Sequence, residues 1–203
     1  MSFHPLMVYD REHFHRSERA RLDEGGPFTF TPERRAALDT LLTQYPPDRK
    51  RSAVLAALYM VQEQEGYLTA SGMRHVAGIL EMTPADVEDV ATYYVMFFRE
   101  KVGTYVLQVC RTLSCALVGA DSLIAYLERK LGITVGETTP DRLFTLKTVE
   151  CLAACGAGPM MQVNNDYYER LTRETIDRIL DDLKRDGRSS LATGPFLIPL
   201  QMA

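Results

Sequence analysis

The chain has 203 residues, of which 46% are hydrophobic and 25% are charged, a composition typical of a globular protein with one large domain or two small ones. The net charge of −4 argues against a nucleic-acid-binding surface, and no apolar run is long enough for direct membrane insertion. The N-terminus lacks the features of a secretion signal, so we expect a cytoplasmic protein with reduced thiols.

The first 30 residues are polar, and we expect residues 1–30 to form an N-terminal tail. They contain three of the four histidines, His4, His13 and His15. His13 and His15 could contact one metal ion, but a solvated tail explains the composition more simply.

Helix signals dominate residues 31–100. Thr31 and Thr83 are each followed by proline, which is typical of a helix start, and Asp86 can complete a capping box with Thr83. Apolar residues recur at helical spacing in four segments, at about residues 32–45, 54–65, 73–80 and 84–94. Short loops and one apolar stripe per helix predict a small antiparallel helical bundle domain over residues 31–100.

The apolar period changes near residue 101. Strands are expected at residues 104–109 and 144–150, a hairpin at 160–171, and amphipathic helices at 119–133 and 172–187. This order predicts a small mixed sheet with helices packed on it, and therefore an α+β fold class for the whole chain. We place this second domain at residues 101–187. Residues 188–203 are expected to be a C-terminal tail, whose apolar end, residues 196–202, could contact a partner or fold back.

All four cysteines lie at the ends of the two predicted long strands. Cys110 and Cys115 follow the first strand as Cys-x4-Cys, and Cys151 and Cys155 follow the second as Cys-x3-Cys. If these strands are neighbours, both loops leave the sheet at the same edge, and four sulfur atoms converge there as two pairs.

Several kinds of site could use these thiols. A redox-active dithiol needs Cys-x-x-Cys, which neither pair has. A structural zinc ion often takes four thiolates, and the spacings do not exclude it. A [2Fe–2S] cluster takes two thiolates on each iron. Four unrelated buried cysteines are also conceivable, although the paired spacing argues against this.

The small residues around the second pair help to choose. The stretch "CLAACGAGPMM" surrounds Cys151 and Cys155 with Ala and Gly, which let backbone N–H groups approach sulfur atoms. Gly156 and Gly158 could also adopt positive φ to bend the chain around a cluster. Spacing and small residues together favour an iron–sulfur cluster over zinc.

These residues resemble a known family. The stretches "YPPDRKRSAVLAALYMVQEQEGYL", "VATYYVMFF", "VGTYVLQVCRTLSC" and "VGETTPDRLFTLKTVECLAACGAGPMMQVNNDYYERLT" are similar to the thioredoxin-like [2Fe–2S] subunits, of 24 kDa or NuoE type, of NADH:quinone oxidoreductase (respiratory complex I). The resemblance covers about residues 28–185. It implies a helical domain followed by a thioredoxin-like ferredoxin domain, with Cys110, Cys115, Cys151 and Cys155 as cluster ligands. The family usually has Gly where Ala153 stands and Ala where Gly158 stands.

The resemblance also implies a role in electron transfer. NADH gives up a hydride, whereas a [2Fe–2S] cluster takes one electron, so a flavin must divide the pair. The resemblance places FMN and the NADH site on a larger partner subunit, and puts this chain at the membrane periphery through the complex. No phosphate-binding glycine loop is evident, so we expect no catalytic residues and no NADH oxidation by this chain alone. Alternatives are the equivalent subunit of an NAD-linked hydrogenase or formate dehydrogenase, or a zinc-stabilised assembly subunit without redox function.

Overall fold

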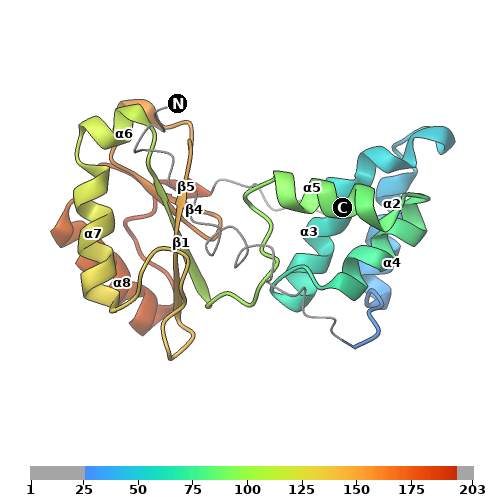
Figure 1. The fold of residues 1–203 in the computed structure, drawn as a ribbon, viewed down its shortest axis with the longest axis horizontal. Helices are drawn as coiled ribbons and strands as arrows, with labels where there is room; N and C mark the ends of the chain where they lie inside the picture. Colours follow the sequence, from blue (N-terminus) through green and yellow to red (C-terminus); the bar gives the residue numbers. More distant parts are fainter. Residues whose placement is uncertain (1–25, 196–203) are drawn as a thin grey trace, which may run out of the picture. The chain divides into compact units, whose positions relative to one another are not determined.

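The structure, a computed structural model, describes residues 26–195 (Figure 1). The expectations for residues 1–25, with His4, His13 and His15, and for residues 196–203 lie outside the described residues. The chain divides between Lys101 and Val102 into two compact units. We call residues 26–101 the helical unit and residues 102–195 the sheet unit.

The helical unit contains the four predicted helices and one additional short helix. In chain order these are α2 (Pro32–Leu42), the 3-10 helix η1 (Pro47–Ala53), α3 (Val54–Glu65), α4 (Ala70–Leu80) and α5 (Pro84–Tyr93). Thr31 accepts a hydrogen bond from the Arg34 N–H at the start of α2. The predicted capping box of Thr83 and Asp86 is present at the start of α5. Local capping signals therefore predicted these helix starts correctly.

The core of the helical unit is made of aliphatic and aromatic side chains. Leu38, Leu58 and Val76 are fully buried at its centre. Phe28 and Phe30 pack edge-to-face on each other, with ring centroids 5.1 Å apart. Both rings also lie 5.5 Å from the His75 ring. The packed part of the chain thus begins before residue 31, inside the segment expected to be a tail.

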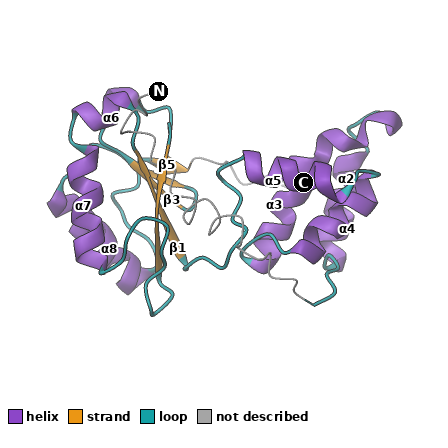
Figure 2. Cartoon of the chain, viewed as in Figure 1, coloured by secondary structure: helices purple, strands orange, loops and turns teal. Residues whose placement is uncertain are grey.

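The sheet unit confirms the α+β fold class. Its elements are β1 (Tyr105–Cys110), α6 (Leu113–Leu117), α7 (Ala120–Leu131), β2 (Phe144–Val149), the 3-10 helix η2 (Cys155–Ala157), β3 (Met161–Val163), β4 (Asp166–Tyr168), α8 (Arg173–Asp186) and β5 (Gly194–Pro195). The strand order in its five-stranded sheet is β2-β1-β3-β4-β5. Strands β1 and β2 are parallel, and the other pairs are antiparallel. Figure 2 shows α7 and α8 on the same side of the sheet.

The core of the sheet unit lies between this sheet and helices α7 and α8. Leu107 and Leu146 from the sheet meet Leu127 from α7 and Ile176 from α8, all fully buried. Sequence reasoning missed α6, with five residues, and β5, with two, because elements this short carry no period. Strand β5 lies inside the segment expected to be the C-terminal tail. None of the helices in the described range is long and apolar enough to cross a membrane.

Candidate metal centre

The parallel pairing of β1 and β2 places the two cysteine-bearing loops at one end of the sheet. Cys110 is the last residue of β1 and lies opposite Val149, the last residue of β2. Cys115 lies in α6, and Cys151 and Cys155 lie in the loop after β2. The expected convergence at one sheet edge is therefore present. All four cysteines are free thiols.

The two pairs differ in burial. Cys110 is 2% exposed and Cys115 is 1% exposed, whereas Cys151 and Cys155 are exposed. Cys110 and Cys115 form a small apolar cluster with Ala120 and Met160. One side of the site is thus packed into the sheet unit, and the other side faces outward.

Polar groups surround the Cys110 sulfur despite its burial. Its Sγ lies 3.3 Å from the Thr112 hydroxyl and 3.4 Å from the Glu150 carbonyl oxygen, to which it donates. Burial acts to raise the pKa of Cys110, but hydrogen bonds from the Thr112 hydroxyl and N–H and from the Leu152 N–H outweigh it, so the pKa is lowered. This environment favours the thiolate, which is the form that binds metals.

The Cys115 thiol has the opposite tendency. Burial raises its pKa to about 11, and its hydrogen bond with Cys110 and the charges of Cys110 and Cys155 act in the same direction. These interactions show that Cys115 lies close to both Cys110 and Cys155. Negative charge on neighbouring sulfurs therefore opposes ionisation of Cys115, and a bound cation would reverse this effect.

The Ala and Gly residues allow a close approach, although not in the expected way. A Cβ on Gly158 would lie 3.3 Å from the Cys115 sulfur and 3.2 Å from Cγ2 of Val118, tighter than ordinary contact. Gly158 therefore lets the second loop lie against the first pair. The expected positive φ is found neither at Gly156 nor at Gly158, but at Ala153, where φ is +60°.

The loop with Cys151 is held by a residue that sequence reasoning missed. Tyr167, in β4, donates from its hydroxyl to the Leu152 carbonyl oxygen at 2.8 Å. The Ala153 N–H donates to the Cys151 Sγ at 3.3 Å. Burial, and then the charges of Cys151 and Cys110, raise the pKa of Tyr167, so its hydroxyl keeps the proton that it donates. The sequence placed Tyr167 in a hairpin, but gave no sign of what its ring contacts.

This arrangement can bind a soft metal centre. Four thiols with nearby N–H and hydroxyl donors fit a [2Fe–2S] cluster, which takes two thiolates on each iron, and thiolates also suit zinc. Within residues 26–195, no three His, Cys, Asp or Glu side chains surround a single point closely enough to hold one metal ion.

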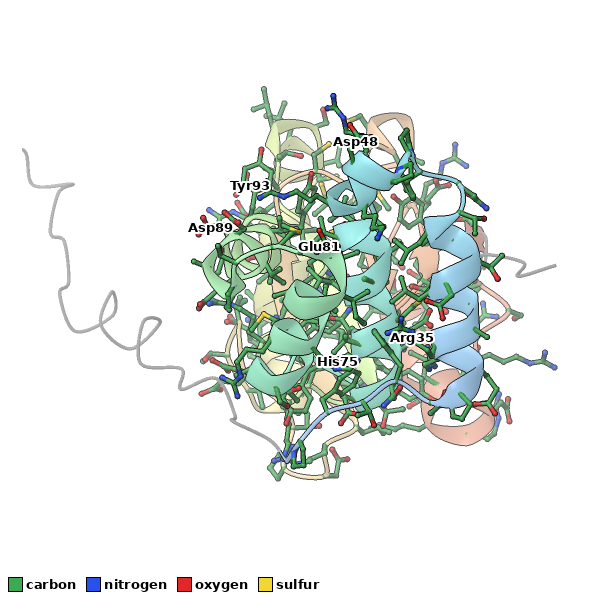
Figure 3. All side chains as sticks on the ribbon, turned by 90° about the vertical axis from the view of Figure 1, so that its right-hand side faces the viewer. Arg35, Asp48, His75, Glu81, Asp89 and Tyr93 are labelled. Carbon is green, nitrogen blue, oxygen red and sulfur yellow. The ribbon has the colours of Figure 1, made fainter. Side chains whose placement is uncertain are left out.

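The helical unit has a separate hollow of about 850 Å³ that is rich in charged groups. Arg35 and Asp39 in its wall form an ion pair at 3.1 Å, and Lys50 lies 3.8 Å from Glu81. Figure 3 shows the labelled Arg35 and His75 on this face of the unit. Burial, followed by the charge of Arg35, lowers the pKa of His75. Because the charges of Arg35 and Lys50 are already paired, we assign no ligand to this hollow.

Comparisons with known proteins agree with the geometry. The family model of the thioredoxin-like [2Fe–2S] ferredoxins matches residues 38–184. The chain is 42% identical to the NuoE-type subunit of the NADH-quinone oxidoreductase of Rickettsia felis over 163 residues, which are 80% of this chain and 98% of that protein. It is 38% identical to the mitochondrial NADH dehydrogenase [ubiquinone] flavoprotein 2 of Dictyostelium discoideum over 191 residues, 88% of this chain and 77% of that one.

A solved structure shares the fold. It is an NAD+-reducing [NiFe]-hydrogenase in the H2-reduced state, with a TM-score of 0.58 and 19% sequence identity. The match covers 66% of this chain and 22% of the hydrogenase chain. At this identity the likeness concerns the fold alone.

Proposed function

The chain belongs to the thioredoxin-like [2Fe–2S] ferredoxin family, and on that premise we propose that it is an electron-transfer subunit of NADH:quinone oxidoreductase. Cys110, Cys115, Cys151 and Cys155 bind one [2Fe–2S] cluster in this proposal. The observation that carries it is the meeting of two cysteine pairs at the shared end of the parallel strands β1 and β2. When bound, such a cluster accepts and releases one electron at a time.

The surroundings of the thiols suit this role. The Thr112 hydroxyl and the Ala153 N–H lie next to the sulfurs of Cys110 and Cys151 and can donate to thiolates. Such donors stabilise the additional negative charge of a reduced centre. Burial of Cys110 and Cys115 keeps water away from one side, while the exposed Cys151 and Cys155 leave the other side open to an electron donor or acceptor.

The chain depends on a partner for the reaction with NADH. A hydride carries two electrons, and a flavin can divide them into single electrons. We assign FMN and the NADH site to a larger partner subunit of the same complex. This chain then reaches the membrane periphery through the complex, without inserting into the bilayer, and is not catalytic toward NADH by itself.

The composition of the centre is the first test. We expect protein purified anaerobically, with iron supplied, to contain about two irons and about two acid-labile sulfides per chain. Reduction should produce a spin-½ EPR signal. Replacing Cys115 with Ser should remove the signal, whereas Ser114→Ala, the same kind of change on the neighbouring residue, should keep it. Stoichiometric zinc without sulfide would favour the assembly subunit without redox function and contradict this proposal.

Dependence on the partner is the second test. NADH alone should not bleach the visible absorption of the purified chain, and adding the flavin-bearing subunit should permit bleaching. Rapid stoichiometric bleaching by the chain alone, without flavin, would contradict a purely electron-transferring role.

A further inference from the structure

One peptide group near the cysteines is hydrogen-bonded at both of its ends. The carbonyl oxygen of Leu152 accepts a hydrogen bond from the Tyr167 hydroxyl at 2.8 Å. The N–H of the same peptide group belongs to Ala153 and donates to the Cys151 Sγ at 3.3 Å. The tyrosine hydroxyl and the cysteine sulfur are thus connected through a single planar unit.

The orientation of this peptide group is unfavourable for the local backbone. Ala153 has φ of +60°, in the left-handed region that residues with a Cβ seldom adopt. Rotation about this bond also sets the direction of the Ala153 N–H. Without an opposing interaction, relaxation of Ala153 to negative φ would turn the N–H away from the Cys151 sulfur. The hydrogen bond from Tyr167 supplies an interaction that opposes this rotation.

Tyr167 itself is firmly placed. It lies in β4, where it pairs with Gln162 of β3 on one side and with Gly194 of β5 on the other. Its carbonyl oxygen accepts a hydrogen bond from the Thr193 N–H at 2.8 Å. Its ring packs against the apolar cluster around Cys110 and Cys115. The hydroxyl is therefore presented to Leu152 from the sheet rather than from the loop that it holds.

We propose that Tyr167 is a positioning residue that keeps the Ala153 N–H on the Cys151 sulfur and thereby raises the reduction potential of the cluster. The inference rests on the proposed function, since it requires Cys151 to be a cluster ligand. A hydrogen bond to a ligand sulfur is stronger when the centre carries the additional electron, so it favours the reduced state. Donation to the carbonyl oxygen also polarises the peptide group and makes its N–H a better donor.

The test compares two tyrosines of the sheet unit that both use their hydroxyl groups. Tyr167→Phe keeps the ring and removes the hydrogen bond to Leu152. Tyr126→Phe is the matched control, because the Tyr126 hydroxyl donates to Asp177 between α7 and α8 at 2.6 Å. Both variants are made in the full chain with the cluster assembled. The readouts are the midpoint potential from an EPR-monitored titration and the Fe–S(Cys) bands in resonance Raman spectra.

We expect Tyr167→Phe to lower the midpoint potential, with a change of about tenfold in the reduction equilibrium, or about 59 mV for one electron. Its Fe–S(Cys) bands should shift, and Tyr126→Phe should match the wild type in both readouts. An unshifted potential in Tyr167→Phe, or an equal shift in Tyr126→Phe, would overturn the inference.

A second variant tests the route through the peptide group. Glycine adopts positive φ readily, so adding Ala153→Gly to Tyr167→Phe should bring the potential back toward the wild-type value. Ala153→Gly alone should leave the potential unchanged. A lowered potential that Ala153→Gly does not restore would mean that Tyr167 acts by another route, and the inference would be wrong. Wild-type protein without iron and sulfide would instead overturn the proposed function.

Discussion

The two units of the molecule differ in what they bury. Among the described residues of the helical unit, Thr69 is the buried polar side chain, and the rest of that core is aliphatic and aromatic. The sheet unit buries two thiols and several polar side chains: Gln108, Thr139, Thr145, Gln162 and Ser189. A core made of apolar side chains is stabilised by burial alone, whereas a core with thiols depends on what those thiols bind. The stability of the two units should therefore respond differently to the same kinds of change.

The largest expected effect comes from removing a cluster ligand. Cys151→Ser should abolish the cluster and loosen the loops of the sheet unit, because the two cysteine-bearing segments are no longer connected. The helical unit contains no cysteine and should keep its amide protection. Hydrogen exchange measured by mass spectrometry can compare the two units. Equal loss of protection in both would mean that they form one cooperative unit.

Core truncation should separate the units in the other direction. Leu58 in the helical unit and Leu146 in the sheet unit are both fully buried. Truncating either to Ala should cost about 2–5 kcal/mol in the free energy of unfolding. Leu58→Ala should leave the visible spectrum of the cluster unchanged, whereas Leu146→Ala should reduce cluster retention. Cluster loss of the same size in both variants would contradict the difference that we draw between the units.

Helix caps offer a matched pair of smaller changes. Thr83 caps α5 in the helical unit, and Thr172 caps α8 in the sheet unit, each within a capping box. Replacing either with Ala should cost about 0.5–2 kcal/mol. Chemical denaturation followed by hydrogen exchange should assign each loss to its own unit. A Thr83→Ala variant that mainly destabilises residues 102–195 would show coupling that the cores do not indicate.

The smallest expected effect is a response to acid in the helical unit. Burial, and then the charge of Arg35, lowers the pKa of His75 from its ordinary value of 6.5. The folded state therefore prefers neutral His75. Its contribution to stability is complete above the unfolded pKa and is lost as the pH falls through the lowered folded value. Thermal unfolding between pH 7 and pH 5 should show a steeper loss for the wild type than for His75→Gln. Parallel curves for the two proteins would rule out this contribution.

The sequence predicted most of the elements, and it did so where the signals are local. Thr83 with Asp86 marked the start of α5, and alternating residues marked β2. The conformation of the second cysteine loop was not predictable in the same way. Positive φ was expected at Gly156 or Gly158, where glycine makes it easy, but it occurs at Ala153. Contacts from outside the loop decide which residue bears the strain.

What the sequence by itself determined is the set of helices, the ends of the two long strands and the presence of four thiols near one another. Caps, periodicity and spacing specify these features because they act over a few residues. Only the tertiary structure decided that Cys110 and Cys115 are buried while Cys151 and Cys155 are exposed. It also decided that Tyr167 reaches Leu152, 15 residues away along the chain. Such contacts depend on how β4 packs beside the loop after β2, and no local pattern encodes that arrangement.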